Sequence, residues 1–157
     1  MRETGIMLVT NHVLSGALIG AAVRNPWLAF PLGFASHLAL DVAPHWGRWR
    51  SHEHFMQVAV TDGLTGLAAM GLATVTAPAD ERVAVVAGMV GAALPDLNKP
   101  GAVLFGHSPF PKAFDDFHGR IQDEAPDRFR SHELVAGAVF AAGFAALSVA
   151  GRRRGRR

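Results

Sequence analysis

The chain has 157 residues, a length that favours one domain. Half of the residues are hydrophobic and only 18% are charged, against about 25% in ordinary soluble domains. Because the chain contains no cysteine, disulfides and thiolate metal sites are excluded, and a metal ion would have to be held by His, Asp or Glu. Eight histidines are available for that purpose.

The basic residues are concentrated in the C-terminal tail, residues 152–157, which contains five arginines. A terminal run of arginine after an apolar segment is typical of the cytoplasmic flank of a membrane span. Nucleic-acid binding would instead need basic residues spread over a folded face, with aromatic residues among them. We therefore expect no nucleic-acid partner, and we expect the C-terminus to lie on the cytoplasmic side of a membrane.

Apolar runs that end at prolines predict five long helices. Thr10 or Asn11 can cap the first, in which Gly16 and Gly20 form a GxxxG pair that permits close helix contact. Asp80 and Ser131 can cap the last two. A polar segment, residues 96–130, separates these two and is expected to hold one short helix over residues 112–122. The five predicted helices cover residues 11–23, 27–43, 54–76, 81–94 and 132–150.

Two uncharged runs reach the lower length limit of a membrane span. They cover residues 63–79 and 134–151, and a span needs about 17–25 residues. We expect an all-α antiparallel bundle of about five helices, embedded in the cell membrane as a multi-pass protein in contact with membrane lipid. The single domain would cover residues 1–151, with the polar insert at 96–130 and a disordered tail at 152–157. A soluble bundle rich in Ala and Gly is the alternative.

An up-and-down arrangement of these helices would bring ligand-type side chains to one end of the bundle. Each such residue lies at the start of an odd-numbered helix or at the end of an even-numbered one. Loop residues alone cannot explain the gathering, because most members lie within or next to helices. The residues in question are His12, His37, Asp41, Asp62, Asp96, His132 and Glu133.

The strongest single pattern is His37 and Asp41, spaced i, i+4 on the predicted second helix. Both side chains would project from one helical face and could grip one ion. The alternative is a structural histidine that hydrogen-bonds to its neighbouring aspartate. The surrounding string, residues 36–45, adds His45 as a further candidate ligand. This string resembles the HxxxD-centred signature of zinc-dependent phospholipase C and of the S1/P1-type nucleases.

Two further motifs strengthen a resemblance to small membrane-bound metal-dependent hydrolase-like families. They are the Thr-Asn-His string at residues 10–12, followed by Gly16, and the Leu-Pro-Asp string at residues 94–96. The N-terminal tryptophan ligand of the phospholipase signature has no equivalent here, so we expect one or two metal ions. The resemblance implies metal ligands at His12, His37, Asp41 and Asp96, with His118 or His132 as additions.

The resemblance implies a metal-dependent hydrolase that acts on a phosphoester at the membrane surface. Zn²⁺ is the expected ion, with Mn²⁺ or Fe as alternatives, and Glu133 or Asp62 is expected to act as general base. Two readings remain open for single residues. Asp62 would otherwise be a helix-terminal acid at an interface, and His118 would otherwise lie on a solvated amphipathic helix. For the whole chain, the alternative is a non-enzymatic membrane protein with a structural or metal-binding His/Asp cluster.

Overall fold

The computed structural model of the protein describes residues 8–46, 51–122 and 128–155. These residues form seven α-helices and one short 3₁₀ helix, without a strand. The long helices match the five predicted ones to within a few residues. The elements are α1 (Val9–Val23), α2 (Pro26–Val42), α3 (His52–Thr76), α4 (Arg82–Ala93), η1 (Leu94–Leu97), α5 (Asn98–Phe105), α6 (Lys112–Ile121) and α7 (Arg130–Arg154).

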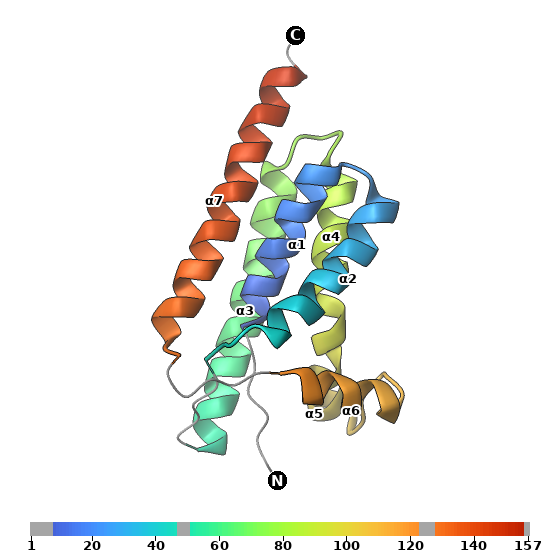
Figure 1. Cartoon of the computed structure of the whole chain (residues 1–157), viewed down its shortest axis with the longest axis vertical. Helices are drawn as coiled ribbons and strands as arrows, with labels where there is room; N and C mark the ends of the chain where they lie inside the picture. Colours follow the sequence, from blue (N-terminus) through green and yellow to red (C-terminus); the bar gives the residue numbers. More distant parts are fainter. Residues whose placement is uncertain (1–7, 47–50, 123–127, 156–157) are drawn as a thin grey trace.

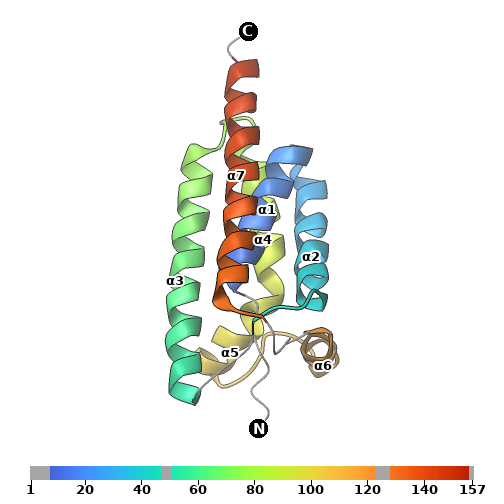
Figure 2. The same ribbon diagram turned by 60° about the vertical axis from the view of Figure 1, so that its left-hand side comes forward.

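The five long helices run up and down side by side, and the short helices α5 and α6 are both at one end of the bundle (Figures 1 and 2). Helix α1 occupies the centre, where it contacts α2, α3, α4 and α7. The starts of α1, α3 and α7 and the ends of α2 and α4 therefore meet at the end that carries α5 and α6 (Figure 1). This end is the one at which the sequence places the histidines and carboxylates.

Glycines allow α1, α2 and α4 to pack with their backbones in contact. A side chain at Gly16 would overlap the carbonyl group of Gly88 in α4, and a side chain at Gly20 would overlap the backbone of Ala84 and Val85. The predicted GxxxG pair thus does permit close helix contact, and its partner is α4. Small residues at such an interface gain dispersion contacts along the whole backbone surface.

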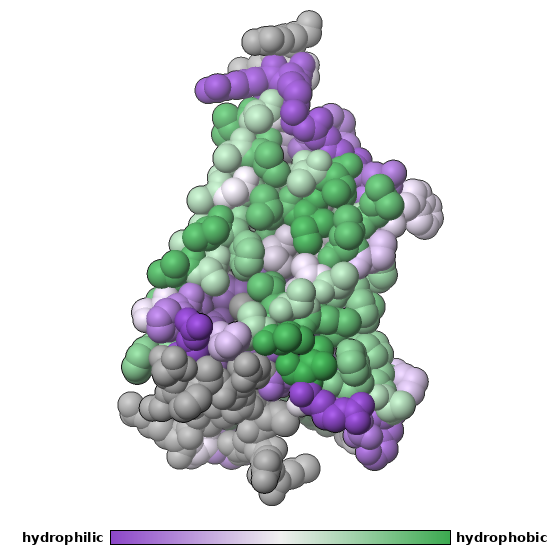
Figure 3. Space-filling view, in the orientation of Figure 1, coloured by the Kyte–Doolittle hydropathy of each residue, from purple (hydrophilic) through white to green (hydrophobic). Residues whose placement is uncertain are grey.

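The buried core of the bundle is small, and most large apolar side chains face outward. The core cluster contains four alanines and only four larger residues, Val13, Val85, Met89 and Phe144. In Figure 3 the apolar surface spans the middle of the molecule, and hydrophilic residues gather towards its two ends. Large apolar side chains thus make up much of the outer surface of the described residues.

Two helices, α3 and α7, are long and apolar enough to cross a membrane by length and composition. At 25 residues each, they extend for about 38 Å, more than the hydrocarbon core of about 30 Å. Only 11% and 22% of their most apolar windows are buried inside the protein. The outer faces of both helices are therefore largely exposed on this chain.

Several helix ends differ from the predictions, and at the start of α1 a tertiary contact takes the place of a local cap. Helix α1 begins at Val9, where the carboxylate of Asp62 from α3 accepts backbone hydrogen bonds. Helix α7 begins at Arg130, before the predicted cap Ser131, and continues through the first half of the predicted tail to Arg154. Arginines at a helix C-terminus are favoured by the helix dipole. The polar insert holds the expected short helix, α6, and also α5, which was not anticipated.

Candidate metal centre

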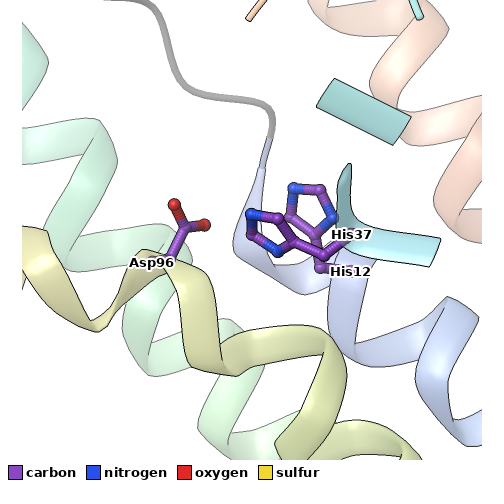
Figure 4. Close-up of side chains that lie close together, drawn as sticks. All are labelled: His12, His37 and Asp96. Atoms are coloured by element: carbon purple, nitrogen blue, oxygen red, sulfur yellow. The ribbon is translucent and has the colours of Figure 1, made fainter. Parts of the chain in front are cut away.

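Five ligand-type side chains from four elements gather at the end of the bundle that carries α6. Each of them is at least 93% buried. Figure 4 shows three of them, one from α1, one from α2 and one from η1. The five residues are His12 on α1, His37 and Asp41 on α2, Asp96 in η1 and His118 on α6.

The tightest part of the cluster is a triangle of three ligand atoms. Nε2 of His37 and Nε2 of His118 lie 3.0 Å apart. Oδ2 of Asp41 lies 2.8 Å from the His118 atom and 3.1 Å from the His37 atom. Ligand atoms that share one tetrahedral zinc ion at bonds of about 2.0–2.1 Å lie about 3.3 Å apart. The triangle is therefore close to the geometry of three ligands on one ion.

A backbone contact determines which nitrogen of His37 carries the proton. Nδ1 of His37 lies 2.6 Å from the carbonyl oxygen of Ala92 in α4. A carbonyl oxygen can only accept, so Nδ1–H donates, and in the neutral ring the lone pair is on Nε2, which faces the triangle. A histidine ligand whose second nitrogen donates to a backbone carbonyl is the usual arrangement at metal sites.

The triangle contains more acceptors than protons. With His37 neutral, Nε2 of His37 and Oδ2 of Asp41 both offer lone pairs, and Nε2 of His118 can carry at most one proton between them. A bound cation would satisfy all three atoms. The alternative is a second proton on His37, which would make the pair with Asp41 a structural ion pair of the kind left open by the sequence.

A second group of ligands adjoins the triangle through His37. The rings of His12 and His37 stack with their centroids 3.8 Å apart. One ligand atom each from His12, His37 and Asp96 lies within 4.8 Å of the other two. Neither ring nitrogen of His12 has a hydrogen-bond partner among the described residues, although Nε2 is 3.3 Å from Oδ1 of Asp41. Asp41 thus directs one oxygen towards each group, as a carboxylate shared by two ions would.

Asp96 connects this second group to the rest of the protein. Burial by itself raises the pKa of Asp96, but Lys99 and the nearby His37 and His12 outweigh it and hold the pKa below its ordinary value. Nζ of Lys99 is 2.5 Å from Oδ1, whereas Oδ2 is buried without a hydrogen-bond partner in the described structure. One oxygen of an ionised carboxylate is therefore available for a cation.

Helix α6 brings His118 to the cluster by docking its apolar face on α2. Phe114, one turn before His118, lies against Phe34 of α2 and against Phe110. Spacing of i, i+4 places Phe114 and His118 on one face. The alternative expectation was that His118 lies on a solvated amphipathic helix. It holds only for the outer face of α6, where Asp116 pairs with Lys112 in an exposed position.

The two carboxylates expected to act as general base both accept hydrogen bonds that position α1. Asp62 accepts from the backbone N–H of Val9 and from the hydroxyl of Thr10, each at 2.6 Å. Glu133 accepts from the side-chain amide of Asn11 at 2.8 Å and from the backbone N–H of Trp46 at 3.2 Å. Their partners on α1, Val9, Thr10 and Asn11, directly precede His12. Neither carboxylate belongs to a ligand group of the described residues.

His132 also lies outside the two ligand groups. Its side chain is exposed, and its Nδ1 accepts the backbone N–H of Phe129 at the start of α7. His45 is buried, and its Nδ1 contacts the carbonyl of Ala43. Of the predicted ligands, the structure thus brings together His12, His37, Asp41, Asp96 and His118.

Sequence reasoning did not identify Ala92 or Lys99 as part of the site. Ala92 acts through its carbonyl oxygen, which any residue could supply, so its side chain carries no signal. Lys99 follows Asp96 at i+3; that spacing was visible but is common in solvated segments. Comparison of the chain with known protein families, with curated proteins and with solved structures gives no match.

Proposed function

We propose that this protein is a membrane-embedded metal-dependent hydrolase that acts on a phosphoester at the membrane surface. The observation that carries the proposal is the triangle of His37 Nε2, His118 Nε2 and Asp41 Oδ2, with sides of 2.8–3.1 Å. It is buried, and the Ala92 carbonyl orients one of its ligands.

The donor set fits Zn²⁺ and tolerates Mn²⁺ or Fe. Two imidazole nitrogens and one carboxylate oxygen are the three-ligand pattern of catalytic zinc sites, which keep a fourth position open. Among the described residues, Nδ1 of His12 and Oδ2 of Asp96 are buried beside the triangle without a hydrogen-bond partner, which favours a cation. The other nitrogen of His12, Nε2, has only Asp41 Oδ1 nearby, at 3.3 Å. A second ion or a solvent molecule would offset the cost of burying these atoms.

A divalent ion would supply Lewis-acid polarisation of a phosphoryl oxygen and would acidify water near neutral pH. The protein's own residues hold the ligands in place. Helix α2 presents His37 and Asp41 from one face, and α6 presents His118 opposite them. We assign Glu133 and Asp62 positioning roles through α1, because hydrogen bonds already engage both carboxylates.

Membrane embedding is supported by the outer surfaces of α3 and α7. Their apolar windows are largely unburied, and large side chains such as Leu67, Leu72 and Val139 are more than 60% exposed. The ligands lie at the end of the bundle at which α2 and α4 end and against which α6 packs. A phosphoester attached to a lipid would reach this end at the level of the head groups.

The experiment is metal analysis and turnover on the protein purified in detergent, with Asp41→Asn as the test variant. Asn keeps the volume of Asp and can accept a hydrogen bond, but it is a poor metal ligand. We expect bound zinc in the wild type, its loss in the variant, and a decrease in phosphodiester hydrolysis of about 10³-fold or more, since Lewis-acid stabilisation supplies several kcal/mol.

Asp116→Asn serves as the matched control, because Asp116 is an exposed aspartate on α6 outside the cluster. It should keep both metal and activity. Wild-type protein that binds metal without turning over any phosphoester would leave a metal-binding membrane protein. If the wild type binds no metal after reconstitution, the cluster is a set of structural His–Asp pairs instead of a metal site.

A further inference from the structure

An apolar groove with a volume of about 640 Å³ runs along α3 next to the metal centre. One wall is a single stripe of α3, which includes Met56, Gly63, Leu67 and Met70, at the spacing expected for one helical face. The start of α1 and the η1–α5 segment form the opposite wall. The stripe extends over 16 residues, from Phe55 to Met70, which corresponds to about 24 Å of helix.

The groove and the metal centre share Asp96. Its carboxylate lies in the groove wall and also in the ligand group with His12 and His37. Three charged side chains line the groove among the described residues, and Lys99 is the one cation. Since Asp62 is engaged by α1, the groove joins a long apolar wall to a polar region formed by Lys99 and the unpartnered oxygen of Asp96.

We propose that the groove holds an acyl chain of an anionic membrane phospholipid, whose phosphate lies between Lys99 and the metal centre. This inference rests on the proposed function and names its substrate class. The volume falls within the range of about 300–1,000 Å³ of small-molecule sites. The length exceeds the thickness of one hydrocarbon leaflet, which is about 15 Å, so a full acyl chain fits along α3.

Nζ of Lys99 pairs with Oδ1 of Asp96 at 2.5 Å, and the two acids of the groove outnumber this one cation. With a divalent ion bound beside Asp96, the balance becomes positive, and charge complementarity then selects an anionic lipid over other apolar occupants. A second copy of the chain or a partner helix would place a bulky apolar face on α3. Such a face offers no negative group to pair with Lys99. A phosphate group matches Lys99 and a divalent ion at once. The large apolar residues on the groove's rim, Leu64, Val103 and Leu104, are more than 60% exposed, so the groove is open to entry of a chain from the side.

The test uses Gly63, because a Cβ atom added there meets nothing within 4 Å and the side chain would enter the groove. Gly63→Phe would therefore add an aromatic ring to the groove wall without a clash at its Cβ. Gly71 lies on the same helix, outside the groove, and its Cβ also meets nothing within 4 Å. Gly71→Phe is thus a matched control for folding and for the general effect of an added aromatic ring.

The probe is phosphatidic acid with a diazirine on its palmitoyl chain, added to the metal-loaded protein in detergent and cross-linked by light. Peptide mapping should place the cross-links on groove residues such as Leu67, Met70 and Leu104. Gly63→Phe should lower them by about tenfold, since losing the burial of two methylene groups already costs that much. Gly71→Phe should leave them unchanged.

A second arm tests the head group through Lys99. The same probe with a choline head group should label the wild type about fivefold less than phosphatidic acid, the effect of about 1 kcal/mol from one lysine near a phosphate. Lys99→Met should abolish this preference, and Lys99→Arg, which keeps the cation, should restore it.

Metal content is measured in every preparation, so that failure of this inference differs from failure of the proposed function. Cross-links spread evenly over the outer faces of α3 and α7, and unaffected by Gly63→Phe, would overturn the lipid site even if the metal is bound. Equal labelling of the wild type by the phosphatidic acid and choline probes would also overturn the lipid site. Groove-specific cross-links in protein that binds no metal would keep the lipid site and reject the hydrolase.

Discussion

Nε2 of His37 and Nε2 of His118 face each other at 3.0 Å, although 81 positions separate the two residues in the chain. Two neutral imidazoles in this arrangement can share only one proton, and Asp41 competes for it at 2.8 Å. The contact therefore becomes favourable when a cation lies between the rings or when one ring is protonated. These two states differ in metal content, which makes the cluster directly testable.

The first prediction separates ligands from other histidines at the same end of the bundle. His118→Ala should lower bound zinc from near stoichiometric to below about one-tenth, because losing one of three ligands removes several of the 10–16 kcal/mol typical of zinc sites. His132→Ala should keep the metal, since His132 is exposed and caps its own helix. Equal metal content in both variants, measured by elemental analysis, would contradict the assignment.

The second prediction concerns the role of Asp62. Asp62→Ala should lower the free energy of unfolding by about 1 kcal/mol, the usual cost of losing a helix cap, because Val9 and Thr10 lose their acceptor. Asp62→Asn keeps an acceptor oxygen and should recover most of the stability. Activity per folded molecule should stay within a few-fold in both. If Asp62 is instead a general base, both variants should lose about 10²–10⁴-fold.

The third prediction concerns the contact of α1 with α4. Gly88→Ala should lower the free energy of unfolding by about 1–3 kcal/mol, the range for overpacking, because the new methyl group would overlap the carbonyl oxygen of Gly16. Gly71→Ala has open space around its Cβ and should be neutral or stabilise α3 by up to about 1 kcal/mol. Thermal unfolding in detergent provides the comparison. Equal effects would show that the helices are not in backbone contact.

The fourth prediction concerns pH and the opposite end of the bundle. Burial raises the pKa of Glu81, and Asp80 adds to this effect, although Arg24 at 3.0 Å opposes it. The folded state then holds its proton to a higher pH than the unfolded state, whose Glu has an ordinary pKa of about 4.5. This contribution to stability is fully present below pH 4.5 and is lost as the pH rises through the folded pKa.

Glu81→Gln isolates that contribution. The free energy of unfolding of the wild type should decrease relative to that of the Gln variant as the pH rises above about 4.5, and the difference should then level off. Asp80→Asn is the control for a general change of charge in the same turn. Nη2 of Arg154 also lies 3.7 Å from Oε1 of Glu81. A wild type that gains stability relative to Glu81→Gln over this interval would show that the ion pairs with Arg24 and Arg154 dominate.

The fifth prediction concerns the membrane. Because α3 and α7 expose most of their apolar windows, the full chain should sediment with membranes and stay there after carbonate extraction. Arginine at Val139, which is 62% exposed near the middle of α7, should cost about 3 kcal/mol in a bilayer and reduce insertion. In a soluble bundle the same exposed substitution would be harmless, and the wild type would be recovered without detergent.

Local sequence determined much of this architecture. Prolines and Asn25 set helix boundaries, because Pro restricts the preceding residue and cannot continue a helix. Apolar runs set the helix lengths. The short connections from α1 to α2 and from α3 to α4 make each pair antiparallel, and alternation along the chain brings the ligand-type residues to one end. The i, i+4 spacing of His37 and Asp41 places both on one face whatever the tertiary structure, and for that reason the pair could be predicted.

Only the tertiary structure decided which other side chains join that pair. His132 and His118 carried equal weight in the sequence, yet packing of Phe114 on α2 brings His118 into the cluster, whereas His132 turns back to cap α7. Asp62 was ambiguous because its partners, Val9 and Thr10, are more than 50 residues away. Hydrogen bonds over such separations depend on how the helices pack, and the residues next to a side chain in the sequence do not determine that packing.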